Sequence, residues 1–236
     1  MLVNVGRGMS PVSARRFSPL DLSPALWLDA ADASTVIETA GSISQWSDKS
    51  GRGYHAVQGT SSVQPDYASD AVGRCVQFNG GNLPLAGTTD YFQLSSAVSG
   101  KTVFFIADWN GNNYSFVLGT AASNSNIFLH NTGYGISIDG GVSDLGEWFV
   151  GGVSRGSGGN IGTPVSTGVS LIHTIKFSSD DPAYPFSRIS TYNDNAGGFG
   201  GKIREIIMFD RYLNASEMNR IGTYLANKWS LSWTTI

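Results

Sequence analysis

Two loop segments carry the residue types that could do binding chemistry. In ADWNGNNYSF, residues 107–116, carboxylate and amide groups that can fix sugar hydroxyls stand beside aromatic rings that can stack on a sugar. The segment SSDDPAYPFS, residues 178–187, has the same character. Each could instead be an ordinary turn, since Asn, Gly and Pro also serve turn geometry. The candidate carbohydrate-binding residues are Asp108, Trp109, Asn110, Asn112, Tyr114, Asp181 and Tyr184.

Motifs for nucleophilic catalysis and phosphate binding are matched only in part. GVSRG at 152–156 places Ser154 in a G-x-S-x-G pattern, but that motif requires a helix directly after it, and SGGNIG follows instead. GGFGGK at 197–202 lacks the Walker spacing, because Ala196 stands at its first glycine and Ile203 at its Ser or Thr. We interpret the first segment as a strand end that runs into a loop and the second as a hairpin turn.

The carboxylate pair that cleaves glycosidic bonds is not apparent in the sequence. Glycoside hydrolysis needs two carboxylates that flank one bond, and the four glutamates of the chain form no such arrangement. Glu217 suits a helix start, and Glu205, in the strand segment KIREIIMFD, predicts a surface salt bridge of little energetic weight. His173 is interpreted as a strand residue, because no second ligand lies at metal spacing. We therefore expect a protein that is not an enzyme.

The elements that must position these residues are predominantly strands. Short β-rich runs alternate with turn residues along the chain, which is typical of an antiparallel sandwich and not of βαβ units. Both faces of KTVFFIAD, residues 101–108, are apolar, so this strand should lie centrally and be covered on both sides. The eleven expected strands lie in ALWLDA, RCVQFN, YFQLS, KTVFFIAD, YSFVLG, NIFLH, YGISID, EWFVGGVS, GVSLIHTIKF, SRISTYN and KIREIIMFD.

One short helix is predicted near the C-terminal end, in LNASEMNRIGTYLANKWSL. Asn214 can cap its start, with Glu217 three residues on as the partner in a capping box. An apolar stripe at helical spacing follows, and it needs a sheet edge or rim to cover. The stripe residues are Met218, Ile221, Leu225 and Trp229.

Composition limits the class of protein. The 236 residues include 30 Gly, only 14% are charged, and the net charge is -3, so we expect one all-β domain. No nucleic-acid partner is expected, because that would need a basic excess. The single cysteine, Cys75, excludes a disulfide framework and is expected to be buried. No apolar run suits a signal peptide or a membrane span, so we expect synthesis in a host cytoplasm and no membrane insertion.

Four segments, taken in order, resemble the concanavalin A-like jelly-roll domains of laminin-G and pentraxin type, which recur in tailed-bacteriophage virion proteins and bacterial surface proteins. They are PALWLDAADAST, SISQWSDKSGRGYHAVQ, QFNG and LNASEMNRIGTYLANKWSL, and they span about residues 20–231. The resemblance implies an antiparallel jelly-roll sandwich of two sheets, no cofactor, and an adhesive or glycan-binding role. The residues that carry it are Trp27, Asp29, Trp46, Asp48, Lys49, Ser50, Gly51, Phe78, Gly80, Lys228 and Trp229.

Two tryptophans and three aspartates within these segments need a structural or a binding interpretation. Trp27 and Trp46 are expected to be core side chains, each with its ring N–H bonded to a backbone acceptor. Some members of the family bind calcium at a sandwich rim, and the resemblance makes Asp29, Asp32 and Asp48 the candidate ligands. Calcium takes about six to eight oxygens, of which three carboxylates supply only part. The alternative for Asp48 is a tight turn in which its side chain bonds the local backbone.

A basic arm, residues 1–20, precedes the jelly-roll domain, residues 21–236. No acidic residue occurs before Asp21, so the arm could lie along an acidic partner surface, where charge steers association more than it adds affinity. The alternative is a solvated tail. A chain that begins at Met1 and enters the domain so early suits a stand-alone virion part. The candidate anchoring residues are Arg7, Arg15 and Arg16.

We therefore expect a non-enzymatic virion structural protein of a tailed phage, a capsid decoration or head fibre. Its partners would be other virion proteins, such as the major capsid or tail protein. On the surface of a virion we expect a homo-oligomer, for instance a trimer. Many weak sites on such an assembly would together adhere to surface glycans. The first alternative is a tail-associated or bacterial carbohydrate-binding adhesion module, and the second is a glycoside hydrolase or polysaccharide lyase.

Overall fold

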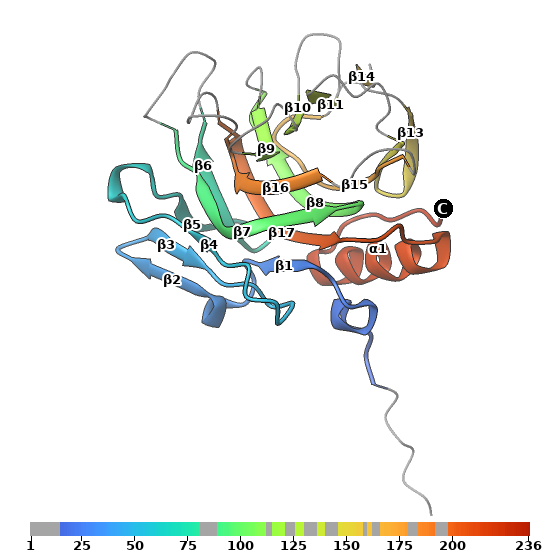
Figure 1. Cartoon of the computed structure of the whole chain (residues 1–236), viewed down its shortest axis with the longest axis horizontal. Helices are drawn as coiled ribbons and strands as arrows, with labels where there is room; N and C mark the ends of the chain where they lie inside the picture. Colours follow the sequence, from blue (N-terminus) through green and yellow to red (C-terminus); the bar gives the residue numbers. More distant parts are fainter. Residues whose placement is uncertain are drawn as a thin grey trace, which may run out of the picture.

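The computed structural model shows an all-β protein, in which antiparallel strands join in one curled sheet and one α-helix lies near the C-terminal end (Figure 1). Within the residues that the structure describes, this confirms the expected all-β class and the short helix near the C-terminal end. No helix in that part of the chain is both long and apolar enough to span a membrane. The described residues are 15–80, 89–111, 115–120, 126–129, 136–139, 146–157, 160–161, 166–178, 184–191 and 198–236.

The strands pair in two runs. In order of pairing, the first run is β6 (Arg74–Asn79), β17 (Gly200–Phe209), β8 (Thr102–Trp109), β15 (Ser170–Lys176), β12 (Glu147–Val150) and β13 (Val153–Ser157). The second run is β2 (Val36–Thr39), β3 (Ser42–Trp46), β4 (Ala56–Val57), β7 (Phe92–Gly100), β16 (Tyr184–Ile189), β9 (Ser115–Gly119), β10 (Asn126–Leu129), β11 (Ile136–Asp139) and β14 (Asn160–Ile161). β5 (Asp66–Ser69) pairs with β3 and β6 and connects the runs, and β1 (Leu26–Asp29) pairs with β17.

Two hydrophobic cores lie on opposite faces of the first run. Along β8 the side chains alternate, so Phe105 belongs to the core between the two runs and Phe104 to the core beneath the helix. β8 is paired on both edges, with β15 and with β17, and is buried along most of its length. These contacts confirm the predicted central position of this strand.

The helix α1 (Ala215–Trp229) begins as the sequence predicts. The Asn214 side chain accepts a hydrogen bond from the Glu217 backbone N–H at 3.0 Å, and the Glu217 carboxylate accepts one from the Asn214 backbone N–H at 3.0 Å. The predicted apolar stripe is buried, but it covers the outer face of β17, β8 and β15, whereas an edge or rim was expected. Three short 3-10 helices complete the described elements: η1 (Pro19–Leu22), η2 (Ala33–Thr35) and η3 (Ser61–Val63).

Several short strands were not predicted from the sequence. β2 and β3 form a hairpin through Ala40 and Gly41, whose φ angles are 52° and 92°. β2 is mostly exposed and every side chain of β13 is exposed, so neither strand shows the apolar alternation that marks a half-buried strand. The interpretation of the Ser154 segment as a strand end that runs into a loop is wrong: the chain turns at Gly151 and Gly152, and Ser154 lies in β13, which pairs back on β12.

Candidate functional site

The pairing of β1 with β17 places Asp29 opposite Glu205. β17 bulges against β8 between Ile203 and Glu205, and Arg204 is the extra residue. Neighbouring strand residues normally point to opposite faces, but here Arg204 and Glu205 both contact Trp229 of α1. The bulge therefore places two consecutive charged residues beneath the helix.

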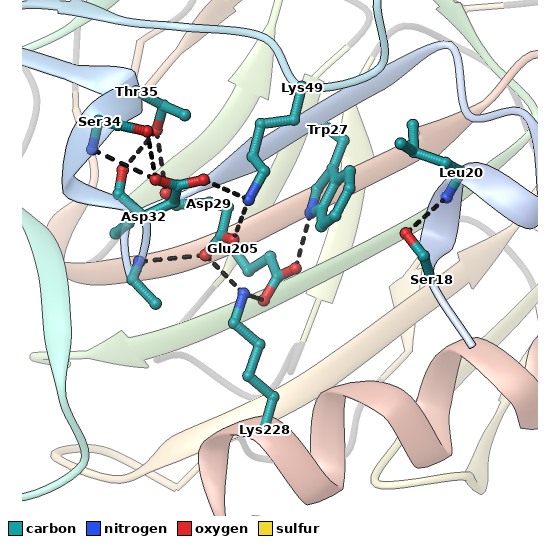
Figure 2. Close-up of polar contacts among 12 residues, drawn as sticks. Ser18, Leu20, Trp27, Asp29, Asp32, Ser34, Thr35, Lys49, Glu205 and Lys228 are labelled. Atoms are coloured by element: carbon teal, nitrogen blue, oxygen red, sulfur yellow. Dashed lines mark hydrogen bonds and ion pairs between the residues drawn. The ribbon is translucent and has the colours of Figure 1, made fainter. Parts of the chain in front are cut away.

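The Glu205 carboxylate is completely buried and accepts hydrogen bonds from four donors, of which Trp27 and Lys228 are labelled in Figure 2. Its Oε1 accepts from Trp27 Nε1 at 2.7 Å and from the Tyr224 hydroxyl at 3.1 Å. Its Oε2 accepts from Lys228 Nζ at 2.8 Å and from Trp229 Nε1 at 2.6 Å. The predicted surface salt bridge of Glu205 is therefore wrong, because α1 covers this part of β17 and the four donors replace the water that the carboxylate loses.

Asp29 is the second buried carboxylate at this place, with 3% of its surface exposed. Its Oδ1 accepts from Lys228 Nζ and from the Ala31 backbone N–H, the latter at 3.1 Å. Its Oδ2 accepts from Lys49 Nζ at 2.8 Å, and the same ammonium lies 2.7 Å from Asp32 Oδ2 (Figure 2). We call these five residues the buried charge cluster: Asp29, Asp32, Lys49, Glu205 and Lys228.

Burial and ion pairing act in opposite directions on this cluster. Burial raises the pKa of Glu205 above its ordinary value, although Lys228 acts to lower it. Burial, and next the Glu205 carboxylate, raise the pKa of the Tyr224 hydroxyl. In contrast, the hydrogen bond from Lys49 helps to lower the pKa of Asp32 to about 2. Asp32 therefore stays ionised at neutral pH, whereas burial makes the Glu205 carboxylate easier to protonate than an exposed one.

Arg204 forms a second buried ion pair beside the buried charge cluster. Its Nη2 donates to both carboxylate oxygens of Asp70, at 2.9 and 2.7 Å, and its Nε donates to Ser170 Oγ at 2.9 Å. The guanidinium lies 6.0 Å from the ring centre of Trp229. Burial alone would raise the pKa of Asp70, but hydrogen bonds from Arg204 and Lys202 hold it well below its ordinary value.

The three aspartates predicted as calcium ligands do not gather in one site. Asp29 and Asp32 share the Lys49 ammonium, which occupies the position where a cation would bind. Asp48 instead accepts hydrogen bonds at 2.8 to 3.1 Å from the backbone N–H groups of Trp27, Ser50 and Tyr54. The bond from Ser50 is the local turn contact that the alternative interpretation predicts. Within the described part of the chain, no group of three or more His, Cys, Asp or Glu side chains could hold a metal ion.

The predicted carbohydrate-binding residues are only partly within the described chain. Trp109 is 2% exposed, and its Nε1 donates to Ser115 Oγ at 2.8 Å, so the prediction that this ring forms an exposed stacking surface is wrong. Trp109 ends the buried strand β8, where its side chain falls on the core face. Asp108 is half-buried and Asn110 is exposed. For Tyr184 the structure describes only the backbone at the start of β16. Outside the described residues lie Asn112, Tyr114 and Asp181.

The end of the basic arm packs on α1. The Phe17 ring contacts the Arg220 guanidinium at 4.4 Å and the Tyr224 ring edge-on at 6.3 Å between centres. Arg15 is exposed and pairs with Asp21 at 2.6 Å. Arg16 lines a groove of about 870 Å³ along the helix. The third predicted anchoring residue, Arg7, lies outside the described residues.

Three buried ring nitrogens and one hydroxyl have no hydrogen-bond partner in the described structure. Trp46 is buried, as predicted, but its Nε1 is one of these atoms. Trp27 Nε1 donates to a carboxylate. Neither ring N–H therefore has the expected backbone acceptor.

His173 lies in β15, as expected, and its ring stacks on Phe105 with 4.7 Å between centres. Burial lowers the pKa of His173 to about 3, so its ring is neutral at physiological pH. The remaining atoms are Trp148 Nε1 and Thr174 Oγ1.

Two features of the sequence, the position of Glu205 and the spacing of residues in the helix, could have indicated the buried charge cluster. A glutamate directly before an apolar run, here Ile206–Phe209, is costly to bury unless it is paired, so Glu205 needed buried donors. Lys228 and Tyr224 each follow a residue of the apolar stripe by three positions, which places them at its border. Spacing therefore could have assigned both to the covered face of α1.

Comparisons with known proteins identify no relative, since no family model and no curated protein matches the chain. The fold and the site define the chain as an all-β protein whose first strand and last helix are joined by a buried charge cluster. Its function must be inferred from that geometry.

Proposed function

We propose that this chain is a non-enzymatic virion structural protein of a tailed phage, a capsid decoration or head fibre that its basic N-terminal arm attaches to other virion proteins. The observation that carries the proposal is the fixed base of the arm. Phe17 contacts Arg220 and Tyr224, so the arm leaves the β domain from a defined point on α1. A tether to a particle needs such a point, because a freely moving linker would leave the domain unoriented.

The groove beside this point supports an acidic partner surface. Arg16 and Arg220 line it, together with hydroxyl and amide side chains. Among the described residues that line it, none is Asp or Glu. A positive groove next to an arm that carries further arginines would steer an acidic capsid or tail protein into register.

The arrangement of the two runs of strands supports the concanavalin A-like jelly roll that belongs to this proposal. Residues of β8, β15 and β17 share one core with residues of β7, β9 and β16. Facing sheets of a sandwich share a core in the same way. β5 would then mark the place where the chain passes between the two sheets.

The saturation of the buried charge cluster supports a structural role over catalysis on a substrate. Both oxygens of Glu205 are engaged by protein donors, and two indole rings cover them. A substrate would have to displace these donors to reach the carboxylate.

Particle occupancy tests the proposal. Deleting residues 1–14 should abolish attachment to purified particles but leave the unfolding midpoint unchanged, because the deletion spares Phe17 and η1. The copy number per particle would be measured by quantitative mass spectrometry against the major capsid protein.

Two substitutions on α1 test the groove separately. Arg220→Glu should lower the occupancy of the particle. Asn227→Asp, which adds a single negative charge farther along the same helix, should lower it less. Unchanged occupancy after the deletion would contradict the proposal.

Carbohydrate binding remains the second candidate, as a tail-associated or bacterial adhesion module. It is favoured only by Asp108 and Asn110, which retain exposed surface at the end of β8. Asp108→Ala together with Asn110→Ala should then weaken retention on a glycan array without changing the unfolding midpoint. A wild-type chain that binds no glycan on the array would remove this candidate.

A further inference from the structure

Lys228, Asp29 and Glu205 bring an amine, a carboxyl carbon and a second carboxyl group together beneath α1, where both carboxylates are buried and the lysine side chain is partly exposed. Lys228 Nζ contacts Asp29 Oδ1 directly and lies 2.8 Å from Glu205 Oε2. Because a carboxyl C–O bond is only about 1.2 Å long, the Asp29 Cγ atom is within about 4 Å of the amine. That separation approaches the roughly 3–3.5 Å at which bound groups are poised to react.

We propose that Lys228 Nζ and Asp29 Cγ form an intramolecular amide bond, with Glu205 as the catalytic proton carrier. The bond would join β1 to α1 covalently. It goes beyond the proposed role in a virion and does not depend on that role.

The reaction condenses an amine with a carboxylate and releases one water molecule. Glu205 first takes a proton from the Lys228 ammonium, and the neutral amine attacks Asp29 Cγ to form the C–N bond. The Cγ–Oδ1 bond then breaks, and Oδ1 leaves as water with one proton from Glu205 and one from the amine nitrogen. Glu205 returns to its carboxylate form, and no atom is oxidised or reduced.

The surroundings favour the protonated form of Glu205 that this reaction needs. Burial penalises charged groups relative to neutral ones, and it raises the pKa of Glu205, so this carboxylate can hold the proton that Lys228 gives up. Trp27 and Trp229 cover Glu205 and donate hydrogen bonds to it. These rings also limit the access of water, which would otherwise compete for the activated carboxyl group.

Two further groups are placed to stabilise the charge that develops on Asp29. Lys49 Nζ lies 2.8 Å from Oδ2, and the Ala31 backbone N–H lies 3.1 Å from Oδ1. Fixed donors on the carboxyl oxygens lower the cost of a tetrahedral intermediate. Lys49 itself is a poor nucleophile: burial would lower its pKa, but hydrogen bonds to Asp29 and Asp32 raise it above the ordinary value and keep the amine protonated.

Intact-mass spectrometry of the purified full chain tests the bond. The wild type should be lighter than its sequence mass by one water, about 18 Da. A tryptic digest should contain a branched peptide in which Lys228 joins the segment that contains Asp29. Lys228→Arg should show its full sequence mass, because Arg keeps the positive charge and the ion pairs but stays protonated.

Further variants separate the chemistry from the fold, which circular dichroism would confirm in each case. Glu205→Gln should keep its full mass, because the proton carrier is lost. Asp29→Asn retains a carbonyl carbon but would release ammonia, so its mass should fall by about 17 Da instead. Asn227→Ala is the matched control: it changes an exposed side chain of the same helix, leaves the three reacting groups in place, and should still lose one water.

A folded wild-type chain that stays at full sequence mass after prolonged incubation at neutral pH would overturn the proposal. A cross-link that maps to Lys49 in place of Lys228 would overturn it as well. Neither result bears on the virion proposal, which is measured by particle occupancy.

Discussion

Trp27 and Trp46 are both buried, but their ring nitrogens have opposite surroundings. Trp27 Nε1 donates to the Glu205 carboxylate at 2.7 Å, whereas Trp46 Nε1 has no partner in the described structure. A buried carboxylate that loses a donor pays a desolvation cost, while removal of an unpaired donor relieves one. The same substitution should therefore have different consequences at the two positions.

Trp27→Phe should lower the free energy of unfolding more than Trp46→Phe, by about 1–3 kcal/mol. Both changes remove a similar volume from a core, so each serves as the control for the other. Urea unfolding followed by tryptophan fluorescence or circular dichroism would give the two values. Equal losses would show that the indole donor contributes nothing to the burial of Glu205.

His173 makes stability depend on pH. Its pKa is about 3 in the folded chain and about 6.5 in an unfolded one, so the unfolded state binds more protons between these values. The contribution of this residue to stability is therefore lost as the pH falls from about 6.5 towards 3. His173→Leu removes that dependence. Between pH 7 and pH 4, the free energy of unfolding of the wild type should therefore fall by roughly 3 kcal/mol more than that of the variant.

Urea unfolding at several pH values would measure this difference. The other titratable groups are the same in both proteins, so the difference between variant and wild type isolates the imidazole. A difference that does not change with pH would contradict the prediction.

At the scale of elements, α1 carries an unusual constraint at Gly222. A Cβ atom there would lie 2.0 Å from the Trp233 ring, which folds back over the helix. Ala in place of Gly normally stabilises a helix interior by about 1 kcal/mol. In this helix, Gly222→Ala should instead destabilise the protein by about 1–3 kcal/mol, because it displaces the ring.

A double-mutant cycle checks the cause of this loss. In a Trp233→Ala background, Gly222→Ala should become stabilising, since the space above the helix is then empty. Thermal or urea unfolding of the four proteins would provide the cycle. The same sign in both backgrounds would mean that Trp233 is not the reason for the glycine.

Elements with a strong local pattern could be predicted, and elements that depend on distant partners could not. β8 has apolar side chains on both faces, and α1 has a capping box and an apolar stripe, so the sequence indicates each directly. β2 and β13 are exposed and short, and their pairing is fixed by hairpin turns and neighbours. Likewise, the polar segment around Trp109 predicts a sugar-binding loop, but Trp109 ends β8 and its ring is buried.

At the scale of the whole molecule, the residues of the candidate site could be recognised one by one, but their contacts could not be predicted. The sequence marked Trp27, Asp29 and Lys228 as notable, but it could not show that they meet. Their contact with Glu205 depends on β1 pairing with β17 and on a bulge that places Arg204 and Glu205 beneath one helix. A bulge of one residue leaves no pattern in a single sequence, so Glu205 was assigned to the surface.

Both described ends of the chain come together on α1 (Figure 1). Phe17 contacts Arg220 and Tyr224, and the Asn219 side chain accepts a hydrogen bond from the Ile236 backbone N–H at 2.9 Å. The helix therefore connects the arm, the first strand and the last residues of the chain. A partner that binds the arm would meet this shared surface first.

The distance along the chain between β1 and its partners also sets an order of events on the ribosome. Trp27 and Glu205 are 178 residues apart, and Asp29 and Lys228 are 199 apart. At roughly 5–20 residues per second, the first strand emerges on the order of 10–40 s before the helix that covers it. During that interval an indole ring and a carboxylate destined for the interior are exposed to the cytosol. Because α1 is translated after β1 and completes its burial, a nascent chain that stalls before α1 is a natural substrate for chaperones.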